Sequence, residues 1–226
     1  MAKNKTKYKK INNEYFKCFS KTINTVLEVD YNDIISNMKD ASLDDHDKGE
    51  NIFLYDGSII NMDAIKLDDM TQHLLQYMRK ERNLRYFEQP YAVDAVCVNQ
   101  KNEWFLIEFK NRPIYKTKDG EQKLDKGVVL SIEQKMFGSL WFLLSLASFS
   151  SKELFGDDVT EFARTHFTYI AVVSRENNPD EYRRIRESPN NLYTPTYFRK
   201  YVGYYFKDVY MLTEYEFRNF VLKFKA

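Results

Sequence analysis

The sequence predicts an α/β or α+β layer fold, because segments with helical periodicity alternate along the chain with short apolar segments. With 226 residues, of which 43% are apolar and 16% aromatic, the chain can bury a substantial core in one large domain. The clearest helix is expected from Val128 to about Phe149. The clearest strand is Phe167 to Val173, a continuous apolar run typical of a strand buried on both faces. This alternation favours a sheet covered by helices.

The N-terminal quarter is expected to hold one helix, an acidic linker and a short hairpin. Apolar residues at helical spacing predict a helix over residues 11–30. Residues 39–51 are polar and acidic and predict a loop or linker. Residues 52–60 predict a short hairpin, because Asp56-Gly57 is a favourable two-residue turn. After this hairpin we expect a helix over 63–87, a hairpin over 91–110 and a polar stretch over 111–126, with a loop tip or small turn at Lys118-Asp119-Gly120. The long helix from Val128, with Ser131 as a candidate cap, and the strand Phe167 to Val173 follow. The last elements are a charged helix over 180–187, a strand over 209–212 and a helix from Thr213.

Charge is unevenly distributed although the net charge is only +1. Residues 1–28 are rich in lysine, and such a basic arm either gathers phosphates or simply forms a soluble, frayed terminus. Neither Cys18 nor Cys97 has metal-site spacing or belongs to a disulfide framework. The first residues do not show the charged-then-apolar pattern of a signal peptide, and the longest apolar run, Leu140 to Ala147, is too short to span a membrane. We therefore expect a soluble cytoplasmic protein with no membrane partner.

Three charged residues lie within the two apolar runs that should form the hairpin over 91–110. If the turn spans Asn99 to Glu103, antiparallel pairing places Asp94 opposite Glu108, and Lys110 projects from the same face two positions later. A shift of one residue in register would send Asp94 to the other face. Two facing carboxylates beside an ammonium group need a cation between them, or the pKa of one carboxyl must rise sharply.

Two interpretations of these charges are open. In the first, Asp94 and Glu108 bind Mg²⁺, or Mn²⁺ in its place, and Lys110 activates a water molecule or stabilises the transition state of a phosphoryl reaction. In the second, Glu-x-Lys arises by chance on a solvated strand face. The apolar neighbours of Glu108 favour the metal site, since charged side chains are almost never buried without partners.

Asp94, followed on a second strand by Glu108-Phe109-Lys110 and then by a helix and an apolar strand, resembles the PD-(D/E)XK nuclease superfamily. The resemblance covers about residues 65–175 and implies a central mixed sheet flanked by helices, the restriction-endonuclease-like fold. It implies a nuclease-like domain over 51–226, preceded by an N-terminal helical extension over 1–50. By the same resemblance, Asp94 and Glu108 bind the metal and Lys110 helps to activate the attacking water.

The resemblance also suggests further site residues. The main-chain carbonyl of Phe109 is a candidate extra metal ligand. A glutamate on the helix before the hairpin would be Glu81 or Glu88, of which Glu81 is preferred. Gln134 and Lys135 stand where some members place a catalytic side chain near the scissile phosphate, although both also fit a polar stripe on a buried helix. A tyrosine four residues after Gln134 would indicate the RecB-like exonuclease branch, but Gly138 occupies that position.

The C-terminal third interleaves basic and aromatic residues. Such a surface either clamps a nucleic-acid backbone and stacks bases or forms a tyrosine-rich packing layer. The residues concerned are Tyr182, Arg183, Arg184, Arg186, Tyr193, Tyr197, Arg199, Lys200, Tyr201, Tyr204 and Tyr205.

The sequence thus predicts a Mg²⁺-dependent nuclease that hydrolyses phosphodiester bonds, in DNA rather than RNA. The alternative is a catalytically inactive nuclease-like fold that acts as a nucleic-acid-binding or regulatory subunit. The sequence leaves open whether the chain works as a monomer or as a homodimer.

Overall fold

The computed structural model of this protein describes residues 13–44, 52–57, 62–86, 88–118 and 120–222. Its centre is a mixed six-stranded sheet with the order β1-β4-β5-β6-β9-β10. The strands from β1 to β6 pair antiparallel with their neighbours, whereas β6, β9 and β10 run parallel. The six strands are β1 (Ile35–Asn37), β4 (Asp63–Ile65), β5 (Ala95–Val98), β6 (Trp104–Lys110), β9 (Phe167–Val173) and β10 (Asp208–Thr213).

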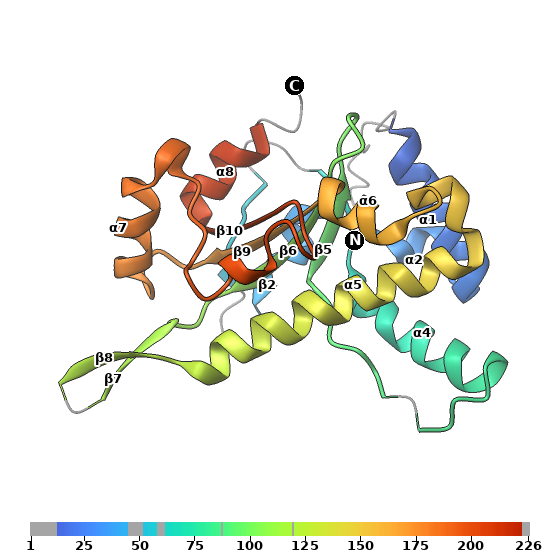
Figure 1. Ribbon diagram of the computed structural model, residues 1–226, viewed down its shortest axis with the longest axis horizontal. Helices are drawn as coiled ribbons and strands as arrows, with labels where there is room; N and C mark the ends of the chain where they lie inside the picture. Colours follow the sequence, from blue (N-terminus) through green and yellow to red (C-terminus); the bar gives the residue numbers. More distant parts are fainter. Residues whose placement is uncertain (1–12, 45–51, 58–61, 87, 119, 223–226) are drawn as a thin grey trace, which may run out of the picture.

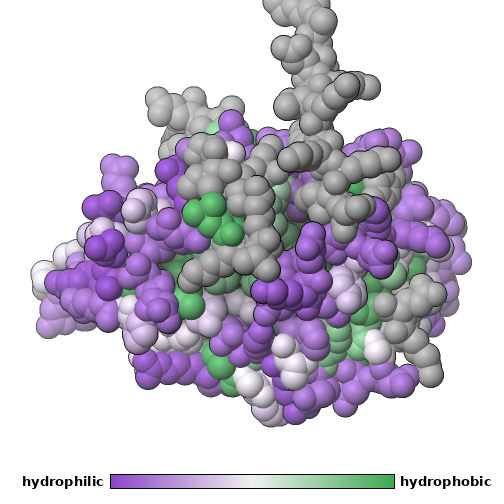
Figure 2. Space-filling model, turned by 90° about the horizontal axis from the view of Figure 1, so that it is seen from above, coloured by the Kyte–Doolittle hydropathy of each residue, from purple (hydrophilic) through white to green (hydrophobic). Residues whose placement is uncertain are grey.

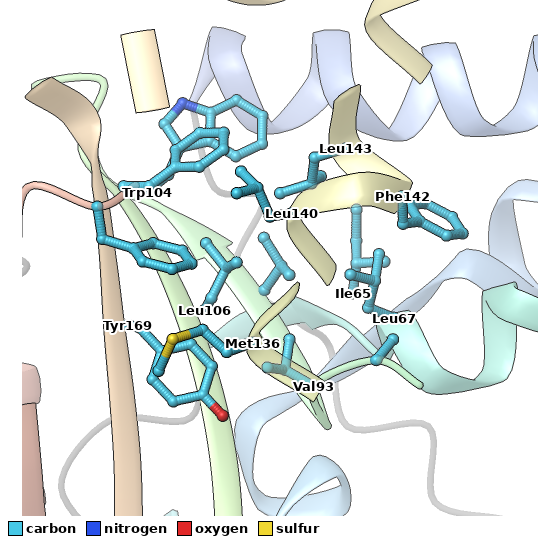
Figure 3. Close-up of a cluster of buried hydrophobic side chains, with 14 of the residues drawn as sticks. Ile65, Leu67, Val93, Trp104, Leu106, Met136, Leu140, Phe142, Leu143 and Tyr169 are labelled. Atoms are coloured by element: carbon cyan, nitrogen blue, oxygen red, sulfur yellow. The ribbon is translucent and has the colours of Figure 1, made fainter. Parts of the chain in front are cut away.

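Four helices cover one face of this sheet, and the longest of them, α5, runs across it (Figure 1). Trp104 and Leu106 project from β6 into the core on this side (Figure 3). The Trp104 ring makes edge and tilted contacts with Phe19 and Phe155. The four helices are α1 (Glu14–Leu27), α4 (Leu67–Glu81), α5 (Lys126–Phe155) and α6 (Val159–His166). Within the described residues, no helix has both the length and the apolar character needed to cross a membrane.

The opposite face of the sheet packs on a second cluster of apolar side chains. Phe105, Ile107 and Phe109 of β6 project to this side, where Phe217 of α8 makes an edge contact with the Phe109 ring. The elements here are α3 (Met38–Ala41), β2 (Leu43–Asp44), β3 (Ile52–Phe53) and α8 (Glu214–Leu222), with α7 (Pro179–Glu187) beside β10. The remaining elements are α2 (Tyr31–Ile34), the hairpin strands β7 (Tyr115–Lys118) and β8 (Glu121–Leu124), and 3-10 turns at Pro189–Asn191 and Arg199–Tyr201.

The α/β class and most of the expected elements are confirmed. The strand expected at 167–173 is β9, and the charged helix and the last strand and helix also form. The long helix begins earlier than expected. Asp125 caps it by accepting a hydrogen bond from the Gly127 amide, whereas the Ser131 hydroxyl donates to the carbonyl of Val128 inside the helix.

Three expectations differ from the structure. Residues 63–65 form β4 rather than the start of a helix, because Ile65 pairs with Ile35 and Val96 in the sheet. The strand β3 pairs with β2, while residues 58–61, the other half of the expected hairpin, lie outside the described residues. Helix α6 was not predicted, since it has only two turns and its one fully covered residue is Ala163.

The segment expected to form an N-terminal extension is built into the domain. Helix α1 buries Phe19 and Ile23 completely in the main core, and β1 is the edge strand of the sheet. Asn13 caps α1, and its side-chain amide also donates to the carbonyl of Val98 on β5 at 2.5 Å. Residues 1–12, most of the basic arm, lie outside the described part of the chain.

Candidate metal centre

The hairpin β5–β6 has the register that the sequence predicts. Val98 pairs with Trp104, and Ala95 pairs with Ile107 at the other end of β5. This register continues to Asp94 and Glu108, which therefore lie at the same end of the hairpin. Asn99 closes the turn by donating its amide to the Glu103 carbonyl at 3.0 Å.

Asp94 lies where the ladder between β5 and β6 ends. Its Oδ2 accepts a hydrogen bond from the Phe109 amide at 2.6 Å, and its Oδ1 accepts one from Lys135 Nζ at 2.8 Å. Just before it, the Val93 amide donates to the Ser139 hydroxyl of α5 at 2.8 Å. The chain before β5 is thus held against α5, and the Asp94 carboxylate, in place of a main-chain carbonyl, accepts the hydrogen bond of the Phe109 amide.

Helix α5 approaches this segment unusually closely at Gly138. A Cβ atom on Gly138 would lie 1.8 Å from the Tyr91 carbonyl oxygen, closer than any non-bonded contact allows. The glycine therefore lets α5 lie against the main chain three residues before Asp94. This contact gives the physical reason why a tyrosine does not stand at this position.

Glu108 is fully buried, and its carboxylate lies between two lysines. Lys135 Nζ is 2.9 Å from Oε2, and Lys110 Nζ is 3.5 Å from Oε1. Despite these ion pairs, neither oxygen accepts a hydrogen bond of ordinary geometry from any described residue. A buried carboxylate with unfilled lone pairs is suited to binding a cation.

The electrostatics of the cluster favour additional positive charge. Burial, together with the nearby Asp94 carboxylate, raises the pKa of Glu108 well above its usual value, against the opposing effect of Lys135 and Lys110. Burial alone would lower the pKa of Lys135, but the two carboxylates outweigh it and raise that pKa. We take Lys135 as fully charged and Glu108 as the group whose ionisation is costly, because only Glu108 is completely removed from solvent.

Asp94, Glu108 and Lys135 line a cleft of about 420 Å³. The cleft opens between the ends of β5 and β6, the start of α4, and the α3–β2 segment. Its walls carry five carboxyl groups and four cationic groups, so phosphate would meet net negative charge there when Glu108 is ionised and no cation is bound. The lining residues are Asp40, Ala41, Leu43, Lys66, Asp68, Asp69, Asp94, Glu108, Phe109, Lys110, Asn111, Arg112 and Lys135.

The donor set of this cleft is small. Among the residues that the structure describes, no group of three or more His, Cys, Asp or Glu side chains is placed to hold a metal ion. Asp94 and Glu108 provide the two carboxylates. The Phe109 carbonyl points to the same side of β6 as the Phe109 amide that contacts Asp94, because both groups of one strand residue face the same neighbour. Two carboxylates suit Mg²⁺, which usually keeps several waters and takes substrate oxygens for its other positions.

The structure brings Lys135 to the site but not the other helical candidates. Gln134 is exposed and does not line the cleft, because adjacent helix residues point about 100° apart. Glu81 ends α4 and lines a different cavity with His73 and Lys80, and Glu88 is exposed outside the cleft. The expectation that Glu81 is a metal ligand is therefore corrected.

Asp68 and Asp69, in the first turn of α4, are the acidic residues of that helix that line the cleft. Partial burial raises the pKa of Asp68; the nearby Asp94 carboxylate adds to this rise and Lys135 opposes it. The sequence carried one signal for this residue, namely two aspartates at the start of a helix, where carboxylates favour the positive end of the helix dipole. Glu81 is thirteen residues further along, roughly 20 Å at 1.5 Å per residue.

Much of the basic and aromatic C-terminal segment serves packing. Tyr201 is buried, and Tyr193, Tyr197 and Tyr205 pack against the main core. Arg184 pairs with the buried Glu181 at 2.7 Å. The packing interpretation is therefore supported for these residues, while Tyr204 stays largely exposed.

Comparison with family models, with curated proteins and with solved structures finds no match to this chain.

Proposed function

We propose that this protein is a metal-dependent nuclease that hydrolyses phosphodiester bonds, with Asp94 and Glu108 as metal ligands and Lys110 beside the attacking water. The observation that carries the proposal is the fully buried Glu108 carboxylate, which lies beside the second carboxylate of Asp94 at the wall of an open cleft, with Lys135 in contact with both. The mixed sheet flanked by helices is compatible with a restriction-endonuclease-like fold.

Mg²⁺ bound there would neutralise charge that develops on phosphorus and lower the pKa of a bound water. In the hydrolysis, the water loses a proton, its oxygen forms a new P–O bond, the ester P–O bond breaks, and the leaving oxygen is protonated. Lys110, whose side-chain nitrogen lies 3.5 Å from Glu108, would orient that water as an ammonium group, or take its proton as a neutral amine. Lys135 would hold the two carboxylates in position, and Asp68 would bind a metal-coordinated water from the cleft rim.

The test uses Glu108→Ala and Lys110→Ala with DNA substrates in the presence of Mg²⁺. Both variants should lose cleavage by more than about 100-fold, because even outer-shell partners of metal ligands are worth 10–100-fold. Lys101→Ala, on the β5–β6 turn at the opposite end of β6, is the matched lysine control and should cleave normally. Full cleavage by either site variant, with a folded circular dichroism spectrum, would refute the proposal.

A second function also has a specific observation in its favour. Lys135 contacts both Asp94 and Glu108, so the chain supplies its own counter-ion where a metal would bind. This arrangement fits a nuclease-like fold that binds nucleic acid or a partner without cleaving it. Titration with Mg²⁺ separates the two functions: a metal that binds only the native state raises the melting temperature, whereas an inactive fold neutralised by Lys135 gains nothing.

A further inference from the structure

The strands β7 and β8 form a two-stranded ribbon that extends away from the body of the protein (Figure 1). Tyr115 pairs with Leu124 at its base, and Thr117 pairs with Gln122 near its tip. Among the described residues of the ribbon, the partly buried Tyr115 and Leu124 at its base pack against the core. We call residues 115–124 the arm. The end of the molecule that carries the arm has a mainly hydrophilic surface (Figure 2).

The direction of the arm is fixed at its base. Arg184 of α7 donates a hydrogen bond to the Tyr115 hydroxyl at 2.6 Å and pairs with the buried Glu181. Ile114, just before the arm, bonds to the Asn178 side chain through its amide and to the Asp125 amide through its carbonyl. An arm held on both sides is oriented before any partner binds, so less entropy is lost on association.

The arm is directly connected to the candidate metal centre at both ends. On one side, Lys110, Asn111 and Arg112 line the cleft and lead into β7. On the other side, β8 leads through Asp125 into α5, which carries Lys135 to the metal centre. A polymer whose reacting bond lies in the cleft would therefore pass along the arm.

Exposed cations follow this route from the cleft onto the arm. Lys123 is paired with Glu121 at 3.1 Å, and such an exposed pair is weak enough to exchange for phosphate, whereas Lys116 is paired at 2.5 Å with the mostly buried Asp125. Arg112 and Lys126 are exposed, and neither has an ion pair with any other described residue. The cations therefore complement a polyanion rather than an apolar partner.

We propose that the arm lies in the major groove of duplex DNA while the scissile phosphate occupies the cleft; this inference rests on the proposed nuclease function. A two-stranded ribbon fits the major groove of B-form DNA, which is about 12 Å wide. Four residues per strand at about 3.4 Å each give a reach on the order of 14 Å, enough to enter that groove. The deep, narrow major groove of duplex RNA excludes such a ribbon.

The test measures binding rather than cleavage. The non-cleaving Glu108→Gln protein is titrated with a labelled DNA duplex, the corresponding RNA duplex and the single DNA strand, by fluorescence anisotropy over a range of salt concentrations. Two forms of the arm are compared with the intact arm. One removes a cation from the arm and one from each segment that flanks it, by Lys123→Gln, Arg112→Gln and Lys126→Gln. The other replaces residues 117–122 with Asn-Gly, which closes a two-residue turn between the paired Lys116 and Lys123.

The intact arm should bind duplex DNA more tightly than either other ligand. Both altered arms should weaken duplex DNA binding at least about tenfold, and loss of three phosphate contacts should reduce the salt slope by roughly 3, at about 0.9 per contact. Lys101→Gln, remote from the cleft, and Glu121→Gln, which removes an anion from the arm, should not weaken binding.

Duplex DNA binding that is unchanged in both altered arms would overturn the inference, as would equal binding of duplex DNA and duplex RNA. Cleavage by the unmodified chain is assayed in parallel. If cleavage occurs but binding does not depend on the arm, only the inference fails. If binding depends on the arm but Mg²⁺ supports no cleavage, the nuclease proposal fails and the arm remains a DNA-binding element.

Discussion

Two fully buried glutamates in this protein have very different surroundings. Glu181 in α7 is paired with Arg184, and Arg184 also donates to the Tyr115 hydroxyl. Glu108 in β6 has two lysines nearby, but it also lies beside a second carboxylate and at the wall of a cleft. We call the first set, Glu181, Arg184 and Tyr115, the arm anchor.

Burial of a carboxylate does not by itself indicate a functional site. Burial raises the pKa of both glutamates. At Glu181, Arg184 and Tyr115 oppose the rise and the like charge of Asp180 has the smallest effect, whereas at Glu108 Asp94 is the second-largest cause of the rise, opposed by Lys135 and Lys110. A like charge placed next to a buried carboxylate has no structural use, since it costs stability. The larger effect of Asp94 on Glu108, together with the position of both side chains at the wall of the cleft, distinguishes a candidate binding site from an anchor.

The largest effect is expected from Gly138→Ala, which acts on the metal centre and not on the arm anchor. The new methyl group would collide with the Tyr91 carbonyl, 1.8 Å away, and push the segment that carries Asp94 out of position. We expect a loss of about 3 kcal/mol or more in stability, and roughly 100-fold in cleavage from misplacement of about 1 Å. Denaturant unfolding and cleavage assays measure the two effects.

Gly127→Ala in the first turn of α5 is the control for this change. Its Cβ would meet only the flexible Asp125 side chain at 3.3 Å, and alanine favours the helix. If both substitutions have equal effects, the close approach of α5 does not position Asp94.

Substitution of the two glutamates should change the stabilisation by Mg²⁺ in different ways. At 100 times its dissociation constant, a ligand specific for the native state adds about 2.7 kcal/mol to the free energy of unfolding. We expect this gain in the unmodified chain and in Glu181→Gln, but not in Glu108→Gln. Thermal melts with and without Mg²⁺ give the answer, and a loss of the gain in Glu181→Gln would contradict the assignment.

The pH dependence of stability should differ in the same way. The pKa of Glu108 is higher in the folded state than in the unfolded state. Between the ordinary glutamate pKa of about 4.3 and this raised pKa, the folded protein therefore binds more protons than the unfolded chain. The free energy of unfolding falls as pH rises through this range. Without metal, Glu108→Gln should remove most of this fall, which amounts to about 1.4 kcal/mol per unit of pKa difference. The slope from pH 4.5 upward, measured by denaturant unfolding, should become flatter. An unchanged slope would show that Glu108 ionises normally.

The smallest effect is expected from Tyr115→Phe in the arm anchor. The substitution removes the hydroxyl that accepts a hydrogen bond from Arg184 and should cost about 1 kcal/mol. The response to Mg²⁺ should be unchanged, because the anchor does not touch the metal centre. A weakened Mg²⁺ response, measured by the same melts, would show that the arm and the centre are coupled.

The sequence was sufficient for the parts of the site that depend on local pattern. The register that brings Asp94 to Glu108 follows from the period of two in a strand and from the length of the turn, both of which are local. The α/β class follows from the alternation of helical periodicity with short apolar segments, and the strand β9 from its continuous apolar run. The sequence offered Gln134 and Lys135 as helix residues near Asp94 and Glu108, and it did not distinguish between them.

Only the tertiary structure decided which distant residues meet this hairpin. Residues 63–65 have the pattern of a helix start, but pairing with β1 and β5 makes them a strand, and this shift places Asp68 rather than Glu81 at the cleft. The rotation of α5 that selects Lys135, and the contact at Gly138 that fixes Asp94, depend on how the helix packs on the sheet. Such packing is determined by side chains far apart in the sequence, and no local pattern records it.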